Sequence, residues 1–308
     1  VDGFGGHANK ETSTGNIFRG CRAWNNGDDG FDLINCYASY IIEYCWSFRN
    51  GYKPHSIESS GGNGAGFKSG GYGMGDIKKV PNPIPQHTVR YCLAYYNRQQ
   101  GFYSNHHLGG LIFENNTAYK NPSNYNMLNR KSSNEAVDVP GYGHIIKNNL
   151  SLSPRNSGGF PQHLINVDNT LSEIKNNSFA PNDLNLSESD FESLNEQELM
   201  GSRKSDGSLP DINFLRLTNH ANFRFSGMGC FINEEAVDYS WIQEPAIVLE
   251  NGVARIVGED SKSFNKFYVN GEEVSIENGI VDLTSMSGEL NLKAISENGA
   301  VTTLIINK

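Results

Sequence analysis

The sequence predicts an all-β protein: a right-handed parallel β-helix, or solenoid, followed by a small antiparallel β domain. Three observations support this fold class. A Gly-Phe pair returns in a similar setting, a strand–turn–strand segment repeats beside it, and Asn-Gly pairs separate short β runs near the end of the chain. The 308 residues allow one large domain with an appendage, and 33 glycines with 37% hydrophobic content favour turn-rich β structure over helical bundles.

The Gly-Phe pair occurs four times in the first third of the chain. If each copy begins one turn of a solenoid, the residues that follow the Phe share one column. A structural ladder would repeat one residue type, so a column that changes chemistry at each turn indicates an active site. The copies are Gly3-Phe4, Gly30-Phe31, Gly66-Phe67 and Gly101-Phe102, and their column reads Gly5, Asp32, Lys68 and Tyr103.

The second repeat is a short strand, a polar turn and another short strand, with alternating apolar positions. A spacing of roughly 24 to 35 residues suits coils stacked about 4.8 Å apart, and the repeated Asn residues suit side-chain amide ladders at the corners. A β-propeller, the alternative, needs longer antiparallel blades and hairpin signals, which we do not find. Copies begin at Ile17, Ile42 and Val89, and degenerate ones at Ile112, Ile145 and Ile174.

Three of the five cysteines occupy the same place in successive repeats: Cys21, Cys45 and Cys92. A buried column of small apolar side chains explains them better than disulfides do. A zinc site is also disfavoured, because the sequence has no CxxC pair.

We expect the solenoid to occupy residues 1–185, with upstream coils missing because the chain starts inside the repeat pattern. Residues 186–239 are expected to pack on it as an irregular segment with one short helix. That helix starts with a capping-box pattern at Ser189–Glu192 and ends at Gly201. Residues 240–308 predict a small antiparallel, sandwich-like domain.

Charge and hydropathy exclude several partners. A net charge of -9 argues against nucleic acid and anionic membranes. The sequence contains no apolar stretch long enough to span a bilayer. We expect a monomer.

Four acidic residues are expected to converge. Asp28, Asp29 and Asp32 lie on a turn between glycines, and Asp2 aligns one coil before Asp29. Uncompensated, these carboxylates would repel one another, and a hard divalent cation resolves the conflict, with all-oxygen ligands favouring Ca²⁺. An exposed acidic turn without a metal is the alternative.

Lys68 is the candidate base. It sits one coil from Asp32, where a bound cation would lower the pKa of its amine and make the neutral form accessible. Glycines around it leave room for a large ligand, although an exposed Lys in a flexible loop remains an alternative. A phosphate-binding loop is excluded, because the Gly-to-Lys spacing does not fit and no βαβ context follows.

A cation beside a neutral base suits β-elimination at a uronic acid. The base removes the C5 proton, the cation stabilises the enolate-like charge, and the C4–O bond breaks to leave a 4,5-unsaturated uronate. Hydrolysis by Asp28 and Asp29 is the alternative, but it would leave Lys68 without a clear role.

The residues in these positions resemble polysaccharide lyase family 9. The resemblance rests on Asp2-Gly3-Phe4, on Asn25–Leu33 and on Gly64–Gly71, and it covers residues 1–185. It implies a right-handed parallel β-helix with Ca²⁺-dependent pectate or rhamnogalacturonan lyase activity. It also implies Ca²⁺ ligation by Asp2, Asp28, Asp29 and Asp32, with Lys68 as the Brønsted base.

This interpretation predicts that the substrate is an acidic pectin backbone of the plant cell wall. It also predicts that the protein is secreted, periplasmic or on the surface of a bacterium. Few cationic residues surround Lys68, which favours rhamnogalacturonan, with its alternating charged and neutral sugars, over polygalacturonate. A pectate lyase remains the nearest alternative. A non-catalytic glycan-binding or adhesin module is the alternative from another class.

Other residues are expected to contact the sugar chain. Tyr103 continues the column, and the residues after it are expected to be scaffold or sugar contacts more than catalytic bases. Arginines and one lysine would neutralise substrate carboxylates, and two tyrosines would stack on sugar faces. The candidates are Tyr72, Arg98, Tyr103, Asn105, His106, His107, Tyr125, Arg130 and Lys131.

Overall fold

The computed structural model describes residues 1–72, 80–155, 162–179, 184–231, 245–250, 252–258, 261–277, 279–297 and 299–308. Its backbone contacts divide the chain into two compact units. The first holds residues 1–218 and a short segment that starts at Gly227. The second holds α1 (Asn219–Arg224) and the C-terminal β strands.

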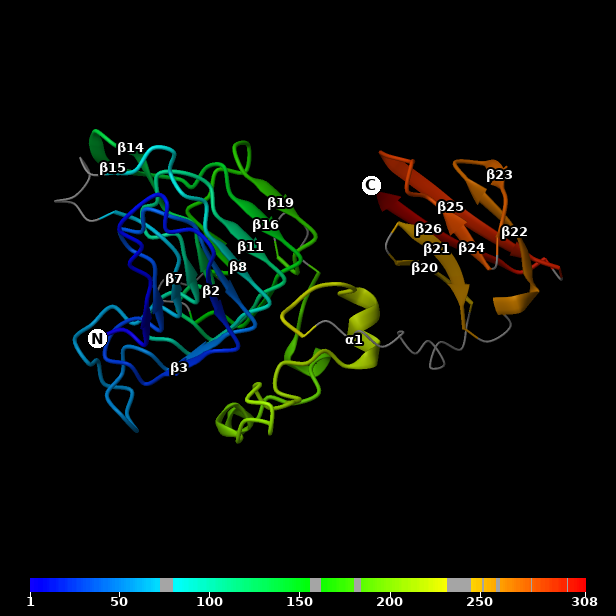
Figure 1. Cartoon of the computed structure of the whole chain (residues 1–308). Helices are drawn as coiled ribbons and strands as arrows, with labels where there is room; N and C mark the ends of the chain where they lie inside the picture. The colour runs from blue at the N-terminus through cyan, green and yellow to red at the C-terminus, as the bar shows by residue number, and fades with distance from the viewer. Residues whose placement is uncertain are drawn as a thin grey trace. The chain divides into compact units, whose positions relative to one another are not determined.

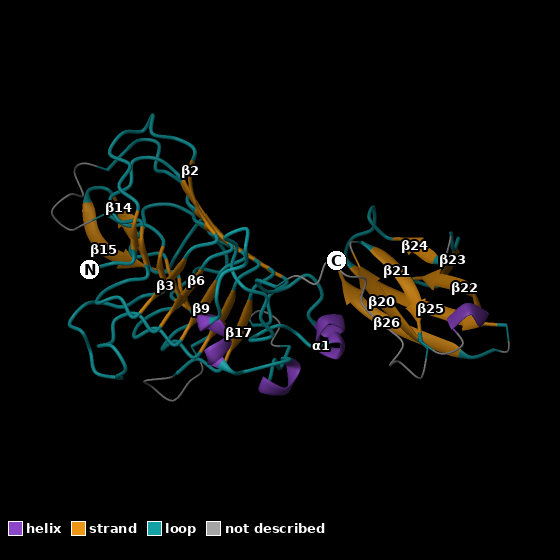
Figure 2. Ribbon diagram, turned by 60° about the horizontal axis from the view of Figure 1, so that its bottom comes forward, coloured by secondary structure: helices purple, strands orange, loops and turns teal. Residues whose placement is uncertain are grey.

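The first unit is a solenoid of three parallel sheets, so the predicted parallel β-helix is confirmed (Figures 1 and 2). The first sheet carries the Gly-Phe copies: β1 (Phe4–Gly5), β4 (Phe31–Asp32), β7 (Phe67–Lys68), β10 (Phe102–Tyr103), β13 (Tyr125–Asn126) and β18 (Leu164–Ile165). The second contains β2 (Asn16–Arg19), β5 (Tyr40–Glu43), β8 (Thr88–Arg90), β11 (Ile112–Glu114), β16 (Ile145–Lys147) and β19 (Glu173–Lys175). The third contains β3 (Arg22–Trp24), β6 (Trp46–Phe48), β9 (Leu93–Tyr95), β12 (Thr117–Tyr119) and β17 (Leu150–Leu152).

The aromatic residues of the Gly-Phe copies form a continuous stack inside the solenoid. Consecutive ring centroids lie 4.9 to 5.0 Å apart, close to the separation of neighbouring strands. The stack therefore fixes the register of the column beside it. It consists of Phe4, Phe31, Phe67, Phe102 and Tyr125.

We expect Phe67→Ala to destabilise the solenoid strongly. Phe67 is fully buried between Phe31 and Phe102, and deleting a buried phenyl ring costs about 3–5 kcal/mol. Chemical denaturation measures the change in the free energy of unfolding. Ile57→Ala is the control, because Ile57 is 73% exposed and should change stability by less than about 0.5 kcal/mol. Equal effects of both substitutions would contradict the packing argument.

Amide ladders close the corners of the coils, as the repeated Asn residues predict. Each amide donates to the carbonyl oxygen of the next over 2.8 to 3.1 Å, from Asn26 through Asn50, Asn97 and Asn121 to Asn124. Two members of the cysteine column, Cys45 and Cys92, are fully buried as predicted, whereas Cys21 is only partly buried, and none of the five cysteines forms a disulfide.

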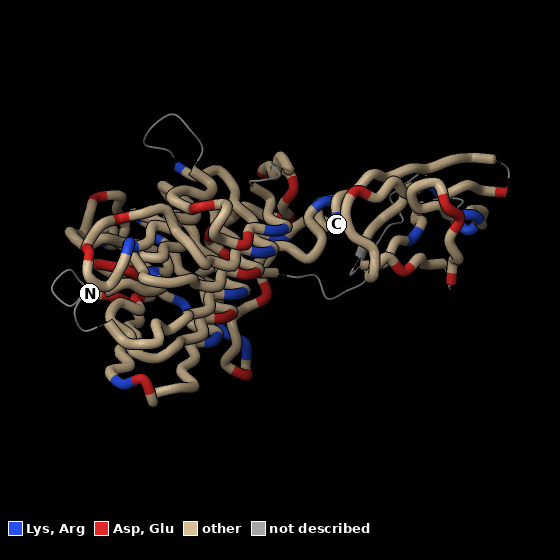
Figure 3. The backbone as a smooth tube through the Cα atoms, turned by 90° about the horizontal axis from the view of Figure 1, so that it is seen from above, with Lys and Arg blue, Asp and Glu red and all other residues tan. Residues whose placement is uncertain are grey.

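The outer face of the second sheet carries a column of charged residues whose sign alternates over the first five members, and opposite charges on neighbouring strands stabilise their pairing. Glu43 lies between Arg19 (2.5 Å) and Arg90 (2.6 Å). Figure 3 shows positive and negative residues interspersed along the solenoid. In register order the column reads Arg19, Glu43, Arg90, Glu114, Lys147 and Lys175.

Residues 184–218 pack on the third sheet. The single helix predicted there is wrong: two short 3₁₀ turns form instead, η2 (Glu188–Asp190) and η3 (Glu196–Met200). Between them the chain is extended, because buried Phe191 bridges to Leu217. The cap also lies earlier than predicted, with the Ser187 N–H donating to Asp190 over 2.8 Å.

A hairpin, β14 (Asn129–Ser132) with β15 (Glu135–Val139), projects from the solenoid. The sequence reading found no hairpin signal in this part of the chain and was wrong here. The two strands pair Arg130 with Asp138, which matters for the candidate site.

The second unit contains two antiparallel sheets that share one hydrophobic core, as predicted. Asn270 and Gly271 both have positive φ (52° and 89°), the conformation that a tight hairpin turn requires. The first sheet contains β20 (Ala246–Glu250), β21 (Val253–Val257) and β24 (Ile280–Asp282). The second contains β22 (Phe264–Val269), β23 (Glu272–Val274), β25 (Glu289–Ser296) and β26 (Val301–Asn307), with η4 (Ser261–Ser263) before β22.

Candidate active site

The predicted column of variable residues is confirmed by strand pairing. Gly5 pairs with Asp32 across β1 and β4, Asp32 with Lys68 across β4 and β7, and Lys68 with Tyr103 across β7 and β10. Their phenylalanine neighbours point into the core, so strand alternation turns the column away from it. An acid, a base and a phenol therefore lie on adjacent coils of one face.

Lys68 is held by two carboxylates. Its Nζ lies 2.9 Å from Asp32 Oδ2 and 3.1 Å from Asp29 Oδ2. Lys68 is only 8% exposed and Asp29 is fully buried. The alternative of an exposed Lys in a flexible loop is therefore wrong.

Burial and charge act against each other in this group. Burial favours the neutral amine of Lys68, but the charges of Asp32 and Asp29 outweigh it and raise the lysine pKa. Burial raises the pKa of Asp29 to about 6 and also raises that of Asp32, despite the attraction of Lys68. One ammonium cannot neutralise two buried carboxylates, so the group retains negative charge.

A second acidic group shares Asp29. One carboxylate oxygen from each of Asp2, Asp28 and Asp29 lies within 4.8 Å of the others. Asp32, expected in the same set, is not part of this group and lies against Lys68 instead. The structure thus brings three of the four predicted metal ligands together.

Backbone N–H groups orient these carboxylates. The N–H groups of Asp29, Asn63 and Ala65 donate to Asp2 Oδ1 (3.1 Å), Asp28 Oδ1 (2.6 Å) and Asp29 Oδ1 (2.7 Å) respectively. Each carboxylate therefore keeps a second oxygen that none of these three bonds occupies.

Glycine allows the loop from Tyr52 to Asn63 to reach Asp28. A Cβ added at Gly62 would lie 2.3 Å from the Gly27 carbonyl oxygen and 2.7 Å from the Asp28 Cα, closer than real contacts allow. Any larger residue at Gly62 would push the Asn63 N–H away from the acidic group.

The residues fit a calcium ion. Asp29 Oδ2 is buried without a hydrogen-bond partner among the described residues, although it lies beside the Lys68 amine. An orphaned carboxylate oxygen in an all-oxygen group is the donor set that Ca²⁺ prefers. Asp2, Asp28 and Asp29 would hold the ion, and Asp32 lies three residues beyond Asp29 on the same coil.

A pocket of ≈ 340 Å³ lies over this column. Tyr103 and His106 form one wall, where the Tyr103 hydroxyl is 2.9 Å from His106 Nε2 and His106 Nδ1 is 2.6 Å from Asp138 Oδ1. The pocket is lined by Asp29, Asn63, Ala65, Lys68, Gln99, Gln100, Tyr103, Asn105 and His106.

Sequence reasoning missed Asp138. It lies on β15 of the hairpin that was not predicted, and it reaches His106 from a segment 32 residues away. Asn129–Ser132 is polar throughout and carries no strand alternation, so the Ser133-Asn134 pair, a turn signal, is the indication that the sequence offers.

Several predicted substrate contacts are part of the scaffold instead. Tyr72 is 5% exposed and its hydroxyl donates to the Cys36 carbonyl. His107 is fully buried, accepts from the Gly71 N–H and bonds the Pro85 carbonyl. Sugar contacts by these two residues are therefore wrong.

Tyr125 is likewise fully buried in the aromatic stack and cannot stack on a sugar. Asn105 lines the pocket, but its amide donates to the Gly70 carbonyl over 2.7 Å.

The three cationic residues predicted to contact substrate carboxylates each interact with other groups of the protein. Arg98 donates to the carbonyls of Gly62 and Asn63 and so fastens the loop beside the acidic group. Arg130 is 5% exposed, and its Nη2 lies 3.9 Å from Asp138. Lys131 pairs with Glu135 at the surface of the hairpin.

Comparisons with known proteins agree with this architecture. A family model described as "Pel9A-like, right handed beta helix region" matches residues 1–178, and one described as "Rhamnogalacturonan lyase-like, C-terminal" matches residues 168–303. The predicted right-handedness of the solenoid is thereby confirmed.

Curated relatives include "Pectate lyase L" of Dickeya chrysanthemi, 35% identical over 78% of this chain and 48% of that protein. "Pectate lyase PEL9" of Emericella nidulans is 28% identical over 70% of this chain and 50% of that protein. The chain thus spans about half the length of the curated relatives it matches.

Similar solved structures include two that are named as lyases. One, "Rhamnogalacturonan lyase", is 53% identical with a TM-score of 0.67, over 75% of this chain and 55% of that chain. The other, "Crystal structure of pectate lyase Pel9A", is 32% identical with a TM-score of 0.57, over 76% of this chain and 54% of that chain.

Proposed function

The chain belongs to the Pel9A-like right-handed β-helix family, and from this premise we propose that it is a lyase that cleaves the pectin backbone by β-elimination at galacturonate. One observation carries the proposal. Lys68 lies in a groove between Asp32 and Tyr103, and its partner Asp29 also belongs to an acidic group that fits Ca²⁺.

Lys68 acts as the base in this mechanism. Its neutral amine takes the C5 proton, the C5–H electron pair becomes the C4=C5 double bond, and the C4–O bond breaks with its electrons on oxygen. The leaving oxygen takes a proton from water. Ca²⁺, when bound, supplies positive charge beside the carboxylate on which enolate-like charge develops.

Asp29 couples the two parts of the site. Because its carboxylate lies 3.1 Å from the Lys68 amine and also belongs to the acidic group, positive charge in that group would weaken the attraction that keeps Lys68 protonated. Asp32 Oδ2 remains 2.9 Å from the amine and keeps it over the groove.

Rhamnogalacturonan is the preferred backbone in this proposal. The rhamnogalacturonan lyase structure shares more identity with this chain (53%) than the pectate lyase Pel9A structure (32%). In addition, Lys68 is the one Lys or Arg side chain that lines the groove pocket among the described residues. A polymer with a charge on every sugar would need more cationic contacts than that.

Digestion of both polymers, followed by the ultraviolet absorbance of the unsaturated product, tests the proposal. We expect Ca²⁺-dependent product formation that is faster on rhamnogalacturonan and lost with a chelator. Faster cleavage of polygalacturonate would overturn the preference. No unsaturated product from either polymer in the presence of Ca²⁺ would favour the alternative, a non-catalytic glycan-binding module.

We expect Tyr103→Phe to lower kcat/KM by roughly 2- to 10-fold, mainly through KM, because a neutral hydrogen bond contributes about 0.5–1.5 kcal/mol. Tyr103 lines the groove beside Lys68, so its hydroxyl can reach a bound sugar. Tyr72→Phe is the matched control, since that hydroxyl is bonded inside the scaffold. It should change stability but leave KM unaltered. A change in KM for Tyr72→Phe, or none for Tyr103→Phe, would contradict the assignment.

The site of action in this proposal is outside the cytoplasm, where a polymer of the plant cell wall is accessible. None of the helices in the described part of the chain has the length and hydropathy needed to span a bilayer.

A further inference from the structure

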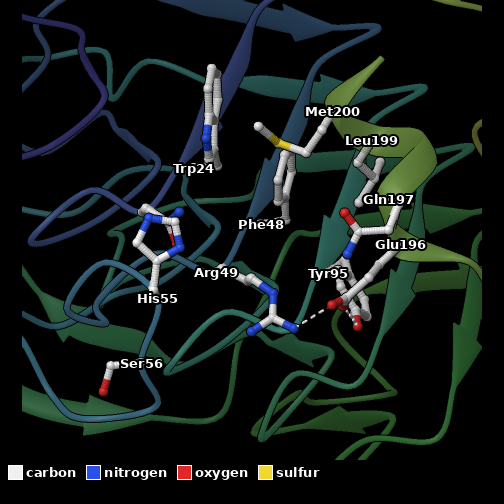
Figure 4. A pocket seen from close by; sticks show the side chains of 11 residues that line it. Trp24, Phe48, Arg49, His55, Ser56, Tyr95, Glu196, Gln197, Leu199 and Met200 are labelled. Carbon is white, nitrogen blue, oxygen red and sulfur yellow. Dashed lines mark hydrogen bonds and ion pairs between the residues drawn. The ribbon is translucent and has the colours of Figure 1, made fainter.

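A second pocket, of ≈ 460 Å³, opens on the outer side of the third sheet (Figure 4). It is lined by the ends of three strands (β3, β6 and β9), by the loop that carries His55, and by η3. Figure 4 shows the side chains from these segments around a shared hollow. The lining residues are Trp24, Asn25, Phe48, Arg49, His55, Ser56, Tyr95, Glu196, Gln197, Leu199 and Met200.

One side of this pocket is aromatic and apolar. Trp24 pairs with Phe48 in the sheet, and their rings are nearly parallel (9°) with centroids 6.0 Å apart. Leu199 and Met200 of η3 face the same hollow. Trp24 is 36% exposed and Met200 is 49% exposed, so large apolar side chains remain open to solvent at the rim.

The pocket walls are held by polar contacts. Arg22 packs over the Trp24 ring (5.2 Å) and donates to the carbonyls of Leu199 (2.7 Å) and Gly201 (2.9 Å). Arg49 pairs with Glu196 over 2.5 Å, and the Tyr95 hydroxyl also donates to Glu196. The site is therefore preformed, which lowers the ordering cost of binding.

Charge in the pocket is balanced. The Arg49–Glu196 pair is neutral as a unit, while His55, Ser56 and Gln197 provide polar groups without a fixed charge. A carboxylate would approach Glu196 and lose hydration, whereas a neutral sugar with an apolar face would bury that face on the exposed Trp24 ring, which stacks on buried Phe48. A 6-deoxy sugar carries a methyl group in place of the hydroxymethyl group, and the exposed Met200 side chain is a suitable neighbour for it.

The pocket lies around one corner of the coil from the active site. Asn25 lines the pocket and Asp29 lines the groove, and four residues of chain span at most about 14 Å. The loop that carries His55 and Ser56 continues to Asn63, whose N–H donates to Asp28. The pocket and the groove are therefore bordered by the same two stretches of chain.

We propose that this pocket binds a neutral deoxysugar, the rhamnosyl residue of rhamnogalacturonan, away from the bond that is cleaved. The proposal rests on the proposed function, because it takes the substrate class from there. The pocket gives the protein a physical reason to prefer a backbone of alternating sugars over polygalacturonate.

Binding measured by calorimetry in a Lys68→Ala background, without turnover, tests this proposal. Trp24→Ala should weaken binding of rhamnogalacturonan backbone oligosaccharides roughly 10-fold, about 1.4 kcal/mol, and leave oligogalacturonate binding unchanged. Tyr44→Ala is the matched control, because Tyr44 is 50% exposed and stacks on Tyr91 on the outer face of another part of the coil.

A second variant distinguishes a loss of binding from a folding defect in Trp24→Ala. Met200→Glu changes an exposed rim residue, so it should fold normally, and its new carboxylate should also weaken rhamnogalacturonan binding selectively. Equal weakening toward both oligosaccharides would overturn the deoxysugar assignment. Unchanged binding in both variants would overturn the site itself, as would occupation of the pocket by another segment of the polypeptide.

The proposed lyase activity is measured in a separate experiment, with protein that retains Lys68. With Lys68 intact, the control variant Tyr44→Ala should form unsaturated product from short substrates at the rate of the unmodified protein. Absence of product in the unmodified protein would reject the lyase function, while the calorimetry would still decide on the pocket.

Discussion

Lys68→Ala is expected to slow product formation on the pectin backbone by about 10²–10⁴-fold, because a positioned general base contributes a factor of that size. In the proposed mechanism Lys68 accepts the C5 proton, and Asp29 and Asp32 hold its amine over the column. Initial rates of absorbance increase from the unsaturated uronate measure the loss. Binding of the uncleaved oligosaccharide should persist, which separates chemistry from recognition.

Controls for this variant must account for stability. Removing Lys68 leaves Asp29 and Asp32 buried without their ammonium partner, and breaking a buried ion pair costs about 3–5 kcal/mol. The melting temperature of Lys68→Ala should therefore fall without Ca²⁺ and recover in part with it. Lys53→Ala, which loses only an exposed pair with Glu58, should change neither rate nor stability. A folded Lys68→Ala protein with normal rates would reject Lys68 as the base.

The coil and its active column could be predicted because strand geometry is periodic. Once the Gly-Phe copies align, the residue after each Phe must share a face, and pairing from Gly5 through Asp32 and Lys68 to Tyr103 follows. Residue type then suggested the chemistry. In this part of the chain, the repeat pattern along the sequence determines which residues are neighbours on adjacent coils.

In the loops, position along the sequence did not predict where a side chain lies. Tyr72 and His107 lie just beyond the column, and sequence position alone placed them in the groove. The chain turns inward there, so both side chains satisfy buried backbone groups instead. Asp138 shows the opposite failure, because it reaches His106 only through a hairpin that the repeat pattern does not contain.

The sequence predicted that acidic residues gather here, but it predicted only in part which of them lie together. Asp32 was grouped with the other three carboxylates because it is close in sequence. Strand alternation places it on the column beside Lys68, whereas Asp28 and Asp29 lie on the preceding turn. A difference of three residues along the coil thus places Asp32 against the base and outside the group of three, whereas Asp29 faces both the base and the other two carboxylates.

This separation makes Asp29→Asn the sharpest test of the metal group. The substitution keeps an oxygen for the Ala65 N–H, so the turn should remain intact, but it removes the charge of a buried carboxylate whose other oxygen has no hydrogen-bond partner among the described residues. Ca²⁺ affinity measured by calorimetry should fall at least about tenfold, or 1.4 kcal/mol. Asp206→Asn, an exposed turn residue bonded only to Ser208 and its N–H, is the control and should leave affinity unchanged.

Thermal unfolding gives an independent readout of the same variant. A ligand at a hundred times its Kd stabilises the folded protein by about 2.7 kcal/mol, so Ca²⁺ should raise the melting temperature of the unmodified protein and raise that of Asp29→Asn much less. Asp32→Asn should retain more of the Ca²⁺ effect while losing activity, because Asp32 contacts the Lys68 amine and lies outside the group of three. Equal loss of Ca²⁺ binding in both variants would instead place Asp32 among the ligands, and an unaltered Ca²⁺ response in Asp29→Asn would move the metal away from this turn.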